Sequence, residues 1–303
     1  MTETRRVQLV DAFTEEPMAG NPAGVVPDAT GLGDEQCQAI AAEIGASETA
    51  FVLPSDGGDR RLRYFTPECE VDLCGHATVA AFASLYDRAV VAADSYDVET
   101  AVGTLDVTVE ADGTVWLTQS PPTVETVDLA LERVAAALGV DDPALSEVGE
   151  DLPLARASTG VPFLVVPVSY FEQLSAVDPD RSAVATLCEE AGAEGLYAFT
   201  FDTLESGATL HGRAFAPLLG IDEDPVTGTA SGAVGAYLRR HGALDQPDPL
   251  LFEQGHFLDS PGRVLVRTET GEGSGPQVGG RAVTTLDGEI TVPEEGADDI
   301  IEA

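Results

Sequence analysis

The sequence predicts an α+β protein built from two related halves rather than a doubly wound parallel sheet. Its apolar segments form short strands and hairpin signals, such as Leu105–Glu110 and Thr114–Thr118 around Asp112-Gly113, with few regular strand–helix alternations. Two stretches about 150 residues apart also repeat the same order of motifs. The length of 303 residues suits two domains of ordinary size.

The periodicity of apolar residues gives the expected elements in order. Helices are expected at Asp34–Ile44, Ala77–Tyr86, Leu129–Leu138, Ser182–Ala191 and Ala230–Arg240. The second and fifth are apolar with small residues on all sides, which is typical of buried helices. The other expected strands are Val7–Phe13, Val25-Val26, Ala50–Leu53, Leu62–Phe65, Phe163–Val168, Gly195–Asp202, Val264–Glu269 and Val283–Val292, with the last broken at Asp287-Gly288.

The internal repeat places a strand before each of the two buried helices. Arg63-Tyr-Phe-Thr-Pro precedes Cys74-Gly-His-Ala, and Arg213-Ala-Phe-Ala-Pro precedes Thr227-Gly-Thr-Ala. The strands are offset by 150 residues (213 − 63) and the helix openings by 153 (228 − 75), so the second copy carries a three-residue insertion. Each helix start offers unpaired N–H groups, and two such ends facing one cleft would hold a carboxylate.

Domain boundaries follow from the repeat and from the linker-like Ser120-Pro-Pro. We expect an N-terminal half at 1–119 and a C-terminal half at 120–285. The C-terminal strand, at about 286–303, is expected to complete the N-terminal half.

Composition and charge exclude several functions. The chain has 53 acidic and 15 basic residues, no lysine, and a net charge of −38. Such a charge repels nucleic acid and anionic membrane surfaces, and it predicts a halophilic, archaeal source. The sequence shows no membrane span and no apolar signal core, so we expect a cytoplasmic protein.

Cofactor motifs are also missing from the sequence. Four cysteines without a CxxC pair, together with only four histidines, argue against a disulfide framework or a metal site. No GxGxxG or P-loop motif follows a strand, so a nucleotide cofactor has no visible cradle.

Four residues could carry chemistry. Glu48 is either a solvated or capping residue, or a proton carrier whose pKa rises in a cleft. His76 is either a capping or core residue, or a hydrogen-bond donor and proton relay. Cys74 is either a small buried side chain or a thiolate activated by a helix N-terminus. Asp224 ends a run of three acids that cannot all be charged in one closed site, and the alternative for it is an N-cap role.

Eight motifs in order resemble one family. They are Asp11-Ala-Phe-Thr, Gly20-Asn-Pro-Ala, Ser47-Glu-Thr-Ala-Phe, Arg63-Tyr-Phe-Thr-Pro, Leu73-Cys-Gly-His-Ala-Thr, Ser158-Thr-Gly-Val-Pro-Phe, Arg213-Ala-Phe-Ala-Pro and Glu223-Asp-Pro-Val-Thr-Gly-Thr-Ala. Together they resemble the phenazine biosynthesis-like (PhzF-like) family, which shares its fold with diaminopimelate epimerase and proline racemase. The resemblance covers about the first 240 residues well, and Gly279-Gly-Arg-Ala-Val fits it too.

The resemblance implies two similar halves, each a curved antiparallel sheet around a central helix, with the active site between them. It implies a homodimer that isomerises a small carboxylate-bearing metabolite by proton transfer at carbon, without metal or organic cofactor. The catalytic residues it implies are Glu48 as proton shuttle, His76 and Asp224. The substrate-binding residues it implies are Asn21, Cys74, Gly75, Thr227, Gly228 and Thr229.

Three departures leave alternatives open. Thr229 stands where phenazine-type members usually have serine. Cys74 matches one of two catalytic cysteines of the epimerase relatives, but Asp224 replaces the other, so a mixed Cys/Asp or single-Glu mechanism remains open. The run Glu253-Gln-Gly-His matches the family only partly.

Two other functions compete with an isomerase. One is a ligand- or partner-binding member of the fold without catalysis. The other is a thiol enzyme that uses Cys74 with His76. Against the second, neighbours at a helix start are expected to splay about 100° apart and to make a poor nucleophile–base pair.

Overall fold

The computed structural model describes residues 3–148, 152–244, 247–268, 271 and 274–294. It divides into two compact units: Met1–Leu117 with Gly280–Ala303, and Thr118–Gly279. The sequence analysis places these divisions at 119/120 and 285/286. The second one differs because the whole of β18 (Ala282–Thr291) belongs to the first unit, whereas a boundary at 285/286 divides this strand. Residues 295–303, which the sequence analysis assigns to the first half, lie outside the described residues.

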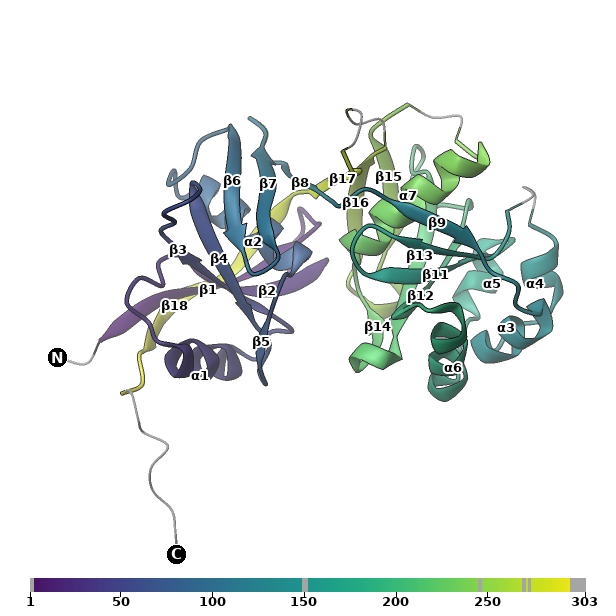
Figure 1. Cartoon of the computed structure of the whole chain (residues 1–303), viewed down its shortest axis with the longest axis horizontal. Helices are drawn as coiled ribbons and strands as arrows, with labels where there is room; N and C mark the ends of the chain where they lie inside the picture. Colours follow the sequence, from purple (N-terminus) through teal and green to yellow (C-terminus); the bar gives the residue numbers. More distant parts are fainter. Residues whose placement is uncertain (1–2, 149–151, 245–246, 269–270, 272–273, 295–303) are drawn as a thin grey trace, which may run out of the picture. The chain divides into compact units, whose positions relative to one another are not determined.

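The first unit is a curved sheet with strand order β18-β1-β2-β3-β4-β6-β7-β8, in which β5 pairs with β4 (Figure 1). Its strands are β1 (Thr4–Ala12), β2 (Asn21–Val26), β3 (Thr49–Leu53), β4 (Arg60–Phe65), β5 (Glu70–Val71), β6 (Ser95–Thr100), β7 (Gly103–Val109), β8 (Val115–Thr118) and β18 (Ala282–Thr291). Its helices are α1 (Asp34–Ile44) and α2 (Gly75–Asp87).

The second unit has the order β9-β10-β11-β12-β13-β15-β16-β17, with β14 beside β13. Its strands are β9 (Thr123–Thr126), β10 (Ala155–Ser158), β11 (Pro162–Pro167), β12 (Gly195–Thr200), β13 (Leu210–Ala216), β14 (Ile221–Asp224), β15 (Leu250–Gln254), β16 (Gly262–Arg267) and β17 (Gln277–Gly280). Its helices are α3 (Leu131–Leu138), α4 (Pro143–Ser146), α5 (Phe171–Ser175), α6 (Arg181–Ala191) and α7 (Gly228–His241), with 3₁₀ turns η1 (Pro217–Leu219) and η2 (His256–Leu258).

The two strand orders correspond one to one, with β18 matching β9 and α2 matching α7. In each unit most neighbouring strands are antiparallel, but two pairs are parallel: β2–β3 and β4–β6 in the first, and β11–β12 and β13–β15 in the second. A parallel pair needs a crossover, and the second crossover of each unit contains the central helix. The chain therefore enters α2 and α7 from the same kind of strand.

The central helices are buried because their side chains are small and apolar all round. Nine consecutive residues of α2, Ala77–Leu85, are buried, and the helix packs against β1, β2, β3, β7 and β18. The helix α7 packs in the same way against β9, β10, β11 and β16. Within the described residues, no helix is both long and apolar enough to cross a membrane.

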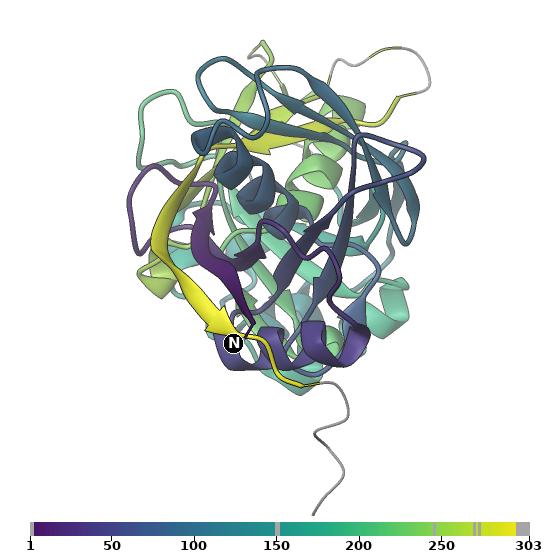
Figure 2. The same cartoon turned by 90° about the vertical axis from the view of Figure 1, so that its left-hand side faces the viewer.

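The last strand corrects one expectation. Asp287-Gly288 does not break β18, because these residues pair with Gln8 and Val7 in the antiparallel ladder with β1. Arg6 adds two hydrogen bonds to the Asp287 carboxylate, at 2.7 and 2.5 Å. Figure 2 shows β18 in yellow beside β1 in purple, so a strand from the end of the chain completes the unit that begins it.

Salt dependence follows from the net charge of −38. We expect the midpoint of thermal unfolding to rise as KCl increases from dilute buffer to molar concentration, because salt screens the repulsion between carboxylates. Circular dichroism at constant pH measures this midpoint. A midpoint that stays the same across the KCl series would contradict the prediction.

Candidate functional site

Three of the predicted site residues form one cluster in the first unit. Glu48 Oε2 lies 3.3 Å from His76 Nε2, and Cys74 Sγ lies 3.3 Å from His76 Nδ1. Their donor atoms all lie within 4.8 Å of one another. The side chains of Glu48 and His76 are 21% and 13% exposed, and Cys74 is buried. A carboxylate, an imidazole and a thiol therefore meet at a partly buried spot that solvent can still reach.

The backbone fixes Glu48 at the junction between α1 and β3. Helix α1 ends at Gly45, whose left-handed backbone (φ 69°) turns the chain toward β3. The Glu48 carbonyl then accepts a 2.9 Å hydrogen bond from Gly24 N on β2. Residue 24 must be glycine here, because a Cβ would lie 2.4 Å from Thr49 Oγ1. The sheet therefore fixes the backbone position from which the Glu48 carboxylate projects.

Cys74 and His76 meet because Cys74 is not yet helical. It is the N-cap of α2, with extended backbone angles (φ −139°, ψ 116°), so the 100° spacing of helical neighbours does not apply to it. The expectation that the two side chains splay apart is therefore wrong. The thiol and the imidazole are 3.3 Å apart, so the expected splay no longer argues against a thiol enzyme that uses Cys74 with His76.

The start of α2 is open on one side and supported on the other. A Cβ on Gly75 would meet no atom within 4 Å, so the helix start has open space beside its first residue. On the other side, Thr78 donates a 2.7 Å hydrogen bond to the Cys74 carbonyl and contacts the Tyr64 hydroxyl at 2.7 Å. Burial raises the pKa of Tyr64, so this hydroxyl stays protonated and acts as a support.

The second unit carries a different set of groups at the start of α7. Thr227, the N-cap, donates from Oγ1 to Asp224 Oδ2 at 2.5 Å. Gln254 on β15 donates to the Asp224 carbonyl (2.8 Å) and to Thr227 Oγ1 (3.1 Å), and accepts from Thr227 N (3.1 Å). Because the amide donates into the hydroxyl, the hydroxyl hydrogen is directed at the Asp224 carboxylate.

The three consecutive acids before α7 go to three different places. Asp222 is exposed and pairs with Arg181 at 2.5 Å. Glu223 pairs with Arg213 through two hydrogen bonds of 2.8 Å, and Asp224 contacts Thr227. The expectation that one acid faces solvent therefore applies to Asp222, and Asp224 is the one beside the helix start.

The remaining predicted residues lie on elements that begin earlier than expected, because α7 starts at Gly228 and not at Ala230, and β2 starts at Asn21 and not at Val25. Gly228 and Thr229 are the first two residues of α7, and the Thr229 carbonyl accepts from Thr159 Oγ1 at 3.1 Å. Asn21 is buried at the start of β2, opposite Ala12. The structure brings together Glu48, Cys74 and His76 in one unit, and Asp224 with Thr227 in the other.

The repeated Arg-x-Phe motif makes the same contacts in both units. The guanidinium of Arg63 lies 5.0 Å from the Phe65 ring and binds Glu70 at 2.7 and 2.8 Å. In the second unit Arg213 lies 5.1 Å from Phe215 and binds Glu223. Each pair ties the strand before the central helix to the short strand that follows it, and so sets the position of the helix start.

A fully buried carboxylate–imidazole contact joins β13 and β15 in the second unit. Glu253 accepts from His211 Nδ1 at 3.0 Å and from the backbone N–H groups of Leu204 (2.9 Å) and Glu205 (2.7 Å). Burial acts to raise the pKa of Glu253, but these hydrogen bonds outweigh it and the pKa lies below its ordinary value. Glu99 occupies the equivalent register position in the first unit and is half exposed.

A carboxylate whose pKa is lowered by folding stabilises the fold at a pH above its ordinary pKa. This contribution is lost as the pH falls through the pKa that the group has in the folded state. We expect Glu253→Gln to lower the free energy of unfolding by about 1–3 kcal/mol near neutral pH. The difference from the unaltered protein should shrink as the pH falls below about 4.5. Urea unfolding at constant KCl measures it. Glu99→Gln is the matched control, and an equal, pH-independent loss in both variants would refute the prediction.

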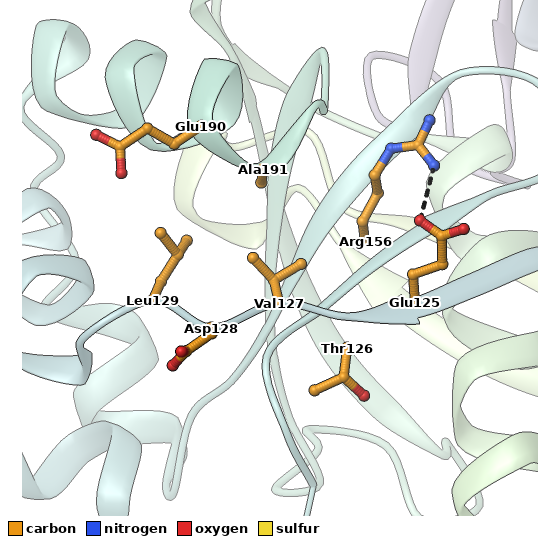
Figure 3. Close-up of a pocket in the computed structure, with 8 residues that line it drawn as sticks. All are labelled: Glu125, Thr126, Val127, Asp128, Leu129, Arg156, Glu190 and Ala191. Carbon is orange, nitrogen blue, oxygen red and sulfur yellow. Dashed lines mark ion pairs between the residues drawn. The ribbon is translucent and has the colours of Figure 1, made fainter.

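A groove of about 550 Å³ lies elsewhere on the second unit (Figure 3). Its lining residues are Glu125, Thr126, Val127, Asp128, Leu129, Arg156, Glu190 and Ala191. Arg156 already donates to the Gly192 carbonyl at 2.6 Å and lies 3.7 Å from Glu125, while Arg133 binds Glu190. None of the predicted site residues lines this groove, and Glu125, Arg156 and Glu190 are already paired.

Sequence reasoning missed two residues of these groups. Ser47 Oγ lies 3.4 Å from His76 Nε2, and Gln254 holds both Asp224 and Thr227. Ser47 is part of the quoted motif around Glu48, and Gln254 is part of a segment that fits the family only partly. Both residues lie next to a predicted site residue in the sequence, but no motif or spacing predicted a role for either of them.

Two known proteins with similar sequences show the class of this protein. The uncharacterized isomerase YfhB of Bacillus subtilis is 37% identical over 84% of this chain and 88% of its own length. The trans-2,3-dihydro-3-hydroxyanthranilate isomerase of Pseudomonas aeruginosa is 32% identical over 90% of this chain and 92% of its own. By this similarity the chain is an isomerase.

The family follows from the same comparison. The family model described as phenazine biosynthesis-like protein matches residues 10–288, and the chain belongs to this family. The crystal structure of a Bacillus anthracis protein of the PhzF family is 34% identical, with a TM-score of 0.85 over 95% of this chain and 99% of that one. A hydroxyproline epimerase of Agrobacterium vitis, at 16% identity and a TM-score of 0.60 over 95% and 91% of the two chains, shares the fold. The fold is thus diaminopimelate epimerase-like, as expected.

Proposed function

We propose that this protein isomerises a small carboxylate-bearing metabolite by moving a proton from one carbon to another, with Glu48 as the proton carrier. The observation that carries the proposal is the contact between Glu48 Oε2 and His76 Nε2 at 3.3 Å, at the start of α2. A positioned carboxylate is an ordinary general base, and the neighbouring imidazole can orient it.

The proposed step is balanced in atoms and charge. Glu48 takes a proton from one carbon of the substrate, and the electron pair left behind moves into the adjacent unsaturated or carboxyl system. The protonated Glu48 then returns the proton to the same carbon or to another one, so the product is an isomer. The N–H groups of Gly75 and His76 at the start of α2 can stabilise the negative charge that develops.

The same proposal includes the other predicted residues. Asp224 is proposed as a second polar contact to the substrate, because Thr227 and Gln254 hold its carboxylate in one orientation. The helix starts at Gly75 and Gly228 are proposed as carboxylate-binding groups. The protein itself supplies a base and charge-stabilising groups, which supports a reaction without metal or organic cofactor. Homodimer formation stays part of the proposal.

The test is deuterium incorporation into candidate substrates in D2O with high KCl, followed by mass spectrometry. The panel holds amino acids, hydroxy acids and cyclic dienoic acids, the last because of the substrate named for the Pseudomonas relative. We expect one class to gain deuterium with the unaltered protein and not with Glu48→Gln. Exchange that persists unchanged in this variant would remove Glu48 from the mechanism.

A thiol enzyme is the second candidate, favoured by the contact between Cys74 and His76. Its test is a substrate-like electrophile. Covalent labelling of Cys74 in proportion to the loss of activity would support it, and activity that survives in Cys74→Ala would exclude it.

A further inference from the structure

We propose that Glu48, Cys74 and His76 form a binding site for a soft divalent cation, Zn²⁺ above all, and that the bound cation switches the isomerase site off. Among the described residues these three are the group whose His, Cys and acidic donor atoms converge within 4.8 Å. The sequence predicts no metal site, because its four cysteines form no CxxC pair and it has only four histidines. These ligands come from the start of β3 and the start of α2.

The donor set is the one that zinc prefers. Thiolate sulfur, imidazole nitrogen and carboxylate oxygen are its usual ligands, and magnesium or calcium would be bound by oxygen alone. Tetrahedral zinc with bonds of about 2.0–2.3 Å keeps its ligand atoms about 3.3–3.5 Å apart. Here Glu48 Oε2 and His76 Nε2 are 3.3 Å apart, and Cys74 Sγ is 3.9 Å from the same nitrogen. The three donor atoms lie within 4.8 Å of one another, and Sγ is 3.3 Å from Nδ1, so the Cys74 side chain has to rotate away from Nδ1 before all three atoms reach one cation on Nε2.

The site also has room for a fourth ligand. A Cβ on Gly75, the residue between Cys74 and His76, would meet no atom within 4 Å, so there is space beside the helix start for a water molecule or a substrate carboxylate as fourth ligand. Ser47 Oγ, 3.4 Å from His76 Nε2, offers a further oxygen at the edge. Three protein ligands with one open position make an exchangeable site rather than a closed structural one.

The second unit provides an internal comparison. Its residues equivalent to Cys74 and His76 are Thr227 and Thr229, because the helix openings are offset by 153 residues (228 − 75). Phe65 faces Thr49 and the equivalent Phe215 faces Leu196, so Gly195 stands where the first unit has Glu48. The same backbone thus carries no thiol, imidazole or carboxylate at these three positions, and the soft donor set belongs to the first unit alone.

Binding and inhibition are separate consequences. Binding rests on the cluster alone. Inhibition rests in addition on the proposed function, because zinc bound to Glu48 would occupy the carboxylate that carries the proton. The high negative charge also gathers divalent cations at the surface, so the measurement must report the sulfur ligand itself.

The probe is Co²⁺ added to the reduced protein in KCl, followed by absorption spectroscopy. We expect a near-ultraviolet thiolate-to-cobalt charge-transfer band, which equimolar Zn²⁺ removes and excess Mg²⁺ does not. Cys74→Ala should abolish the band, and Glu48→Gln should weaken binding at least tenfold. Cys69→Ala is the matched control, because Cys69 is exposed and outside the cluster. Burial raises the pKa of Cys37 to about 11 and that of Cys188 to about 12, so neither thiol competes.

Several outcomes overturn the proposal: no band in folded protein, a band that persists in Cys74→Ala, or a band that Mg²⁺ removes as well as Zn²⁺ does. Deuterium exchange with and without Zn²⁺ then tests inhibition. A band without any enzymatic exchange would support the metal site and count against the proposed function. Exchange that continues at saturating Zn²⁺ would refute the switch.

Discussion

Replacing Glu48 by glutamine is expected to lower the rate of proton exchange about 10²- to 10⁴-fold, the usual contribution of a positioned general base. Glutamine keeps the shape and the hydrogen-bonding oxygen beside His76, but it cannot accept a proton from carbon. The fold should be unaffected, because the carboxylate is at the surface of the unit and its backbone carbonyl makes the structural contact with Gly24. Deuterium incorporation into the substrate class found by the panel measures the rate.

Two further variants make this result specific. Glu43→Gln removes an exposed carboxylate from α1 and should leave the rate unchanged. Glu48→Asp keeps the acid but withdraws it from His76 by one methylene, so an intermediate rate is expected. A Glu48→Gln rate within twofold of the unaltered protein, in folded material, would exclude Glu48 as the shuttle.

Removal of Arg213 is expected to cost about 3–5 kcal/mol of folding free energy, the range for breaking a buried ion pair. Its side chain is 8% exposed, and it binds the carboxylate of Glu223 and the carbonyls of Leu174 and Val177. Arg213→Met would keep much of the apolar stem and leave Glu223 as an uncompensated charge that is 14% exposed. Urea unfolding at constant molar KCl measures the loss.

The repeat supplies the matched control for this prediction. Arg63→Met breaks the equivalent pair, but Glu70 is 44% exposed and Asp34, the other partner, is 84% exposed. Water can replace the lost arginine there, so a loss of about 0.2–1 kcal/mol is expected. If Arg213→Met does not fold, Arg213→Lys keeps the charge and loses only the two-point contact. Equal losses at positions 63 and 213 would show that burial does not decide the effect.

The internal repeat predicted most of what the sequence could show of the fold. Two strands ending in Arg-x-Phe-x-Pro and two apolar helices that open with Gly-x-Ala are local patterns, and both were found. The parallel pairs β4–β6 and β13–β15 were not foreseen, because pairing between strands on either side of a helix leaves no mark in a short window. The continuity of β18 was missed for the same kind of reason: its partner β1 lies about 280 residues away, and the Asp287-Gly288 turn signal is local.

In the candidate site too, local features could be predicted from the sequence and non-local contacts could not. The position at the end of an element predicted Glu48, His76 and Cys74 one by one. Their mutual contact depends on the pairing of β2 with β3, which fixes where Glu48 lies along α2. The role of Gln254 depends on β15 lying beside β13, a non-local pairing. The thiol–imidazole contact was judged wrongly, because one residue at a helix start has extended rather than helical backbone angles.

The pairing of β1 with β18 has a consequence for synthesis on the ribosome. The second unit is one continuous segment, Thr118–Gly279, so all of its strands are synthesised before β18. The first unit starts earlier but lacks β18 until the whole second unit has been synthesised, and β1 keeps an unpaired edge until then. The half that is made first is therefore the half that folds last, and nascent chains truncated before Ala282 should contain a protease-resistant second unit and a protease-sensitive first one.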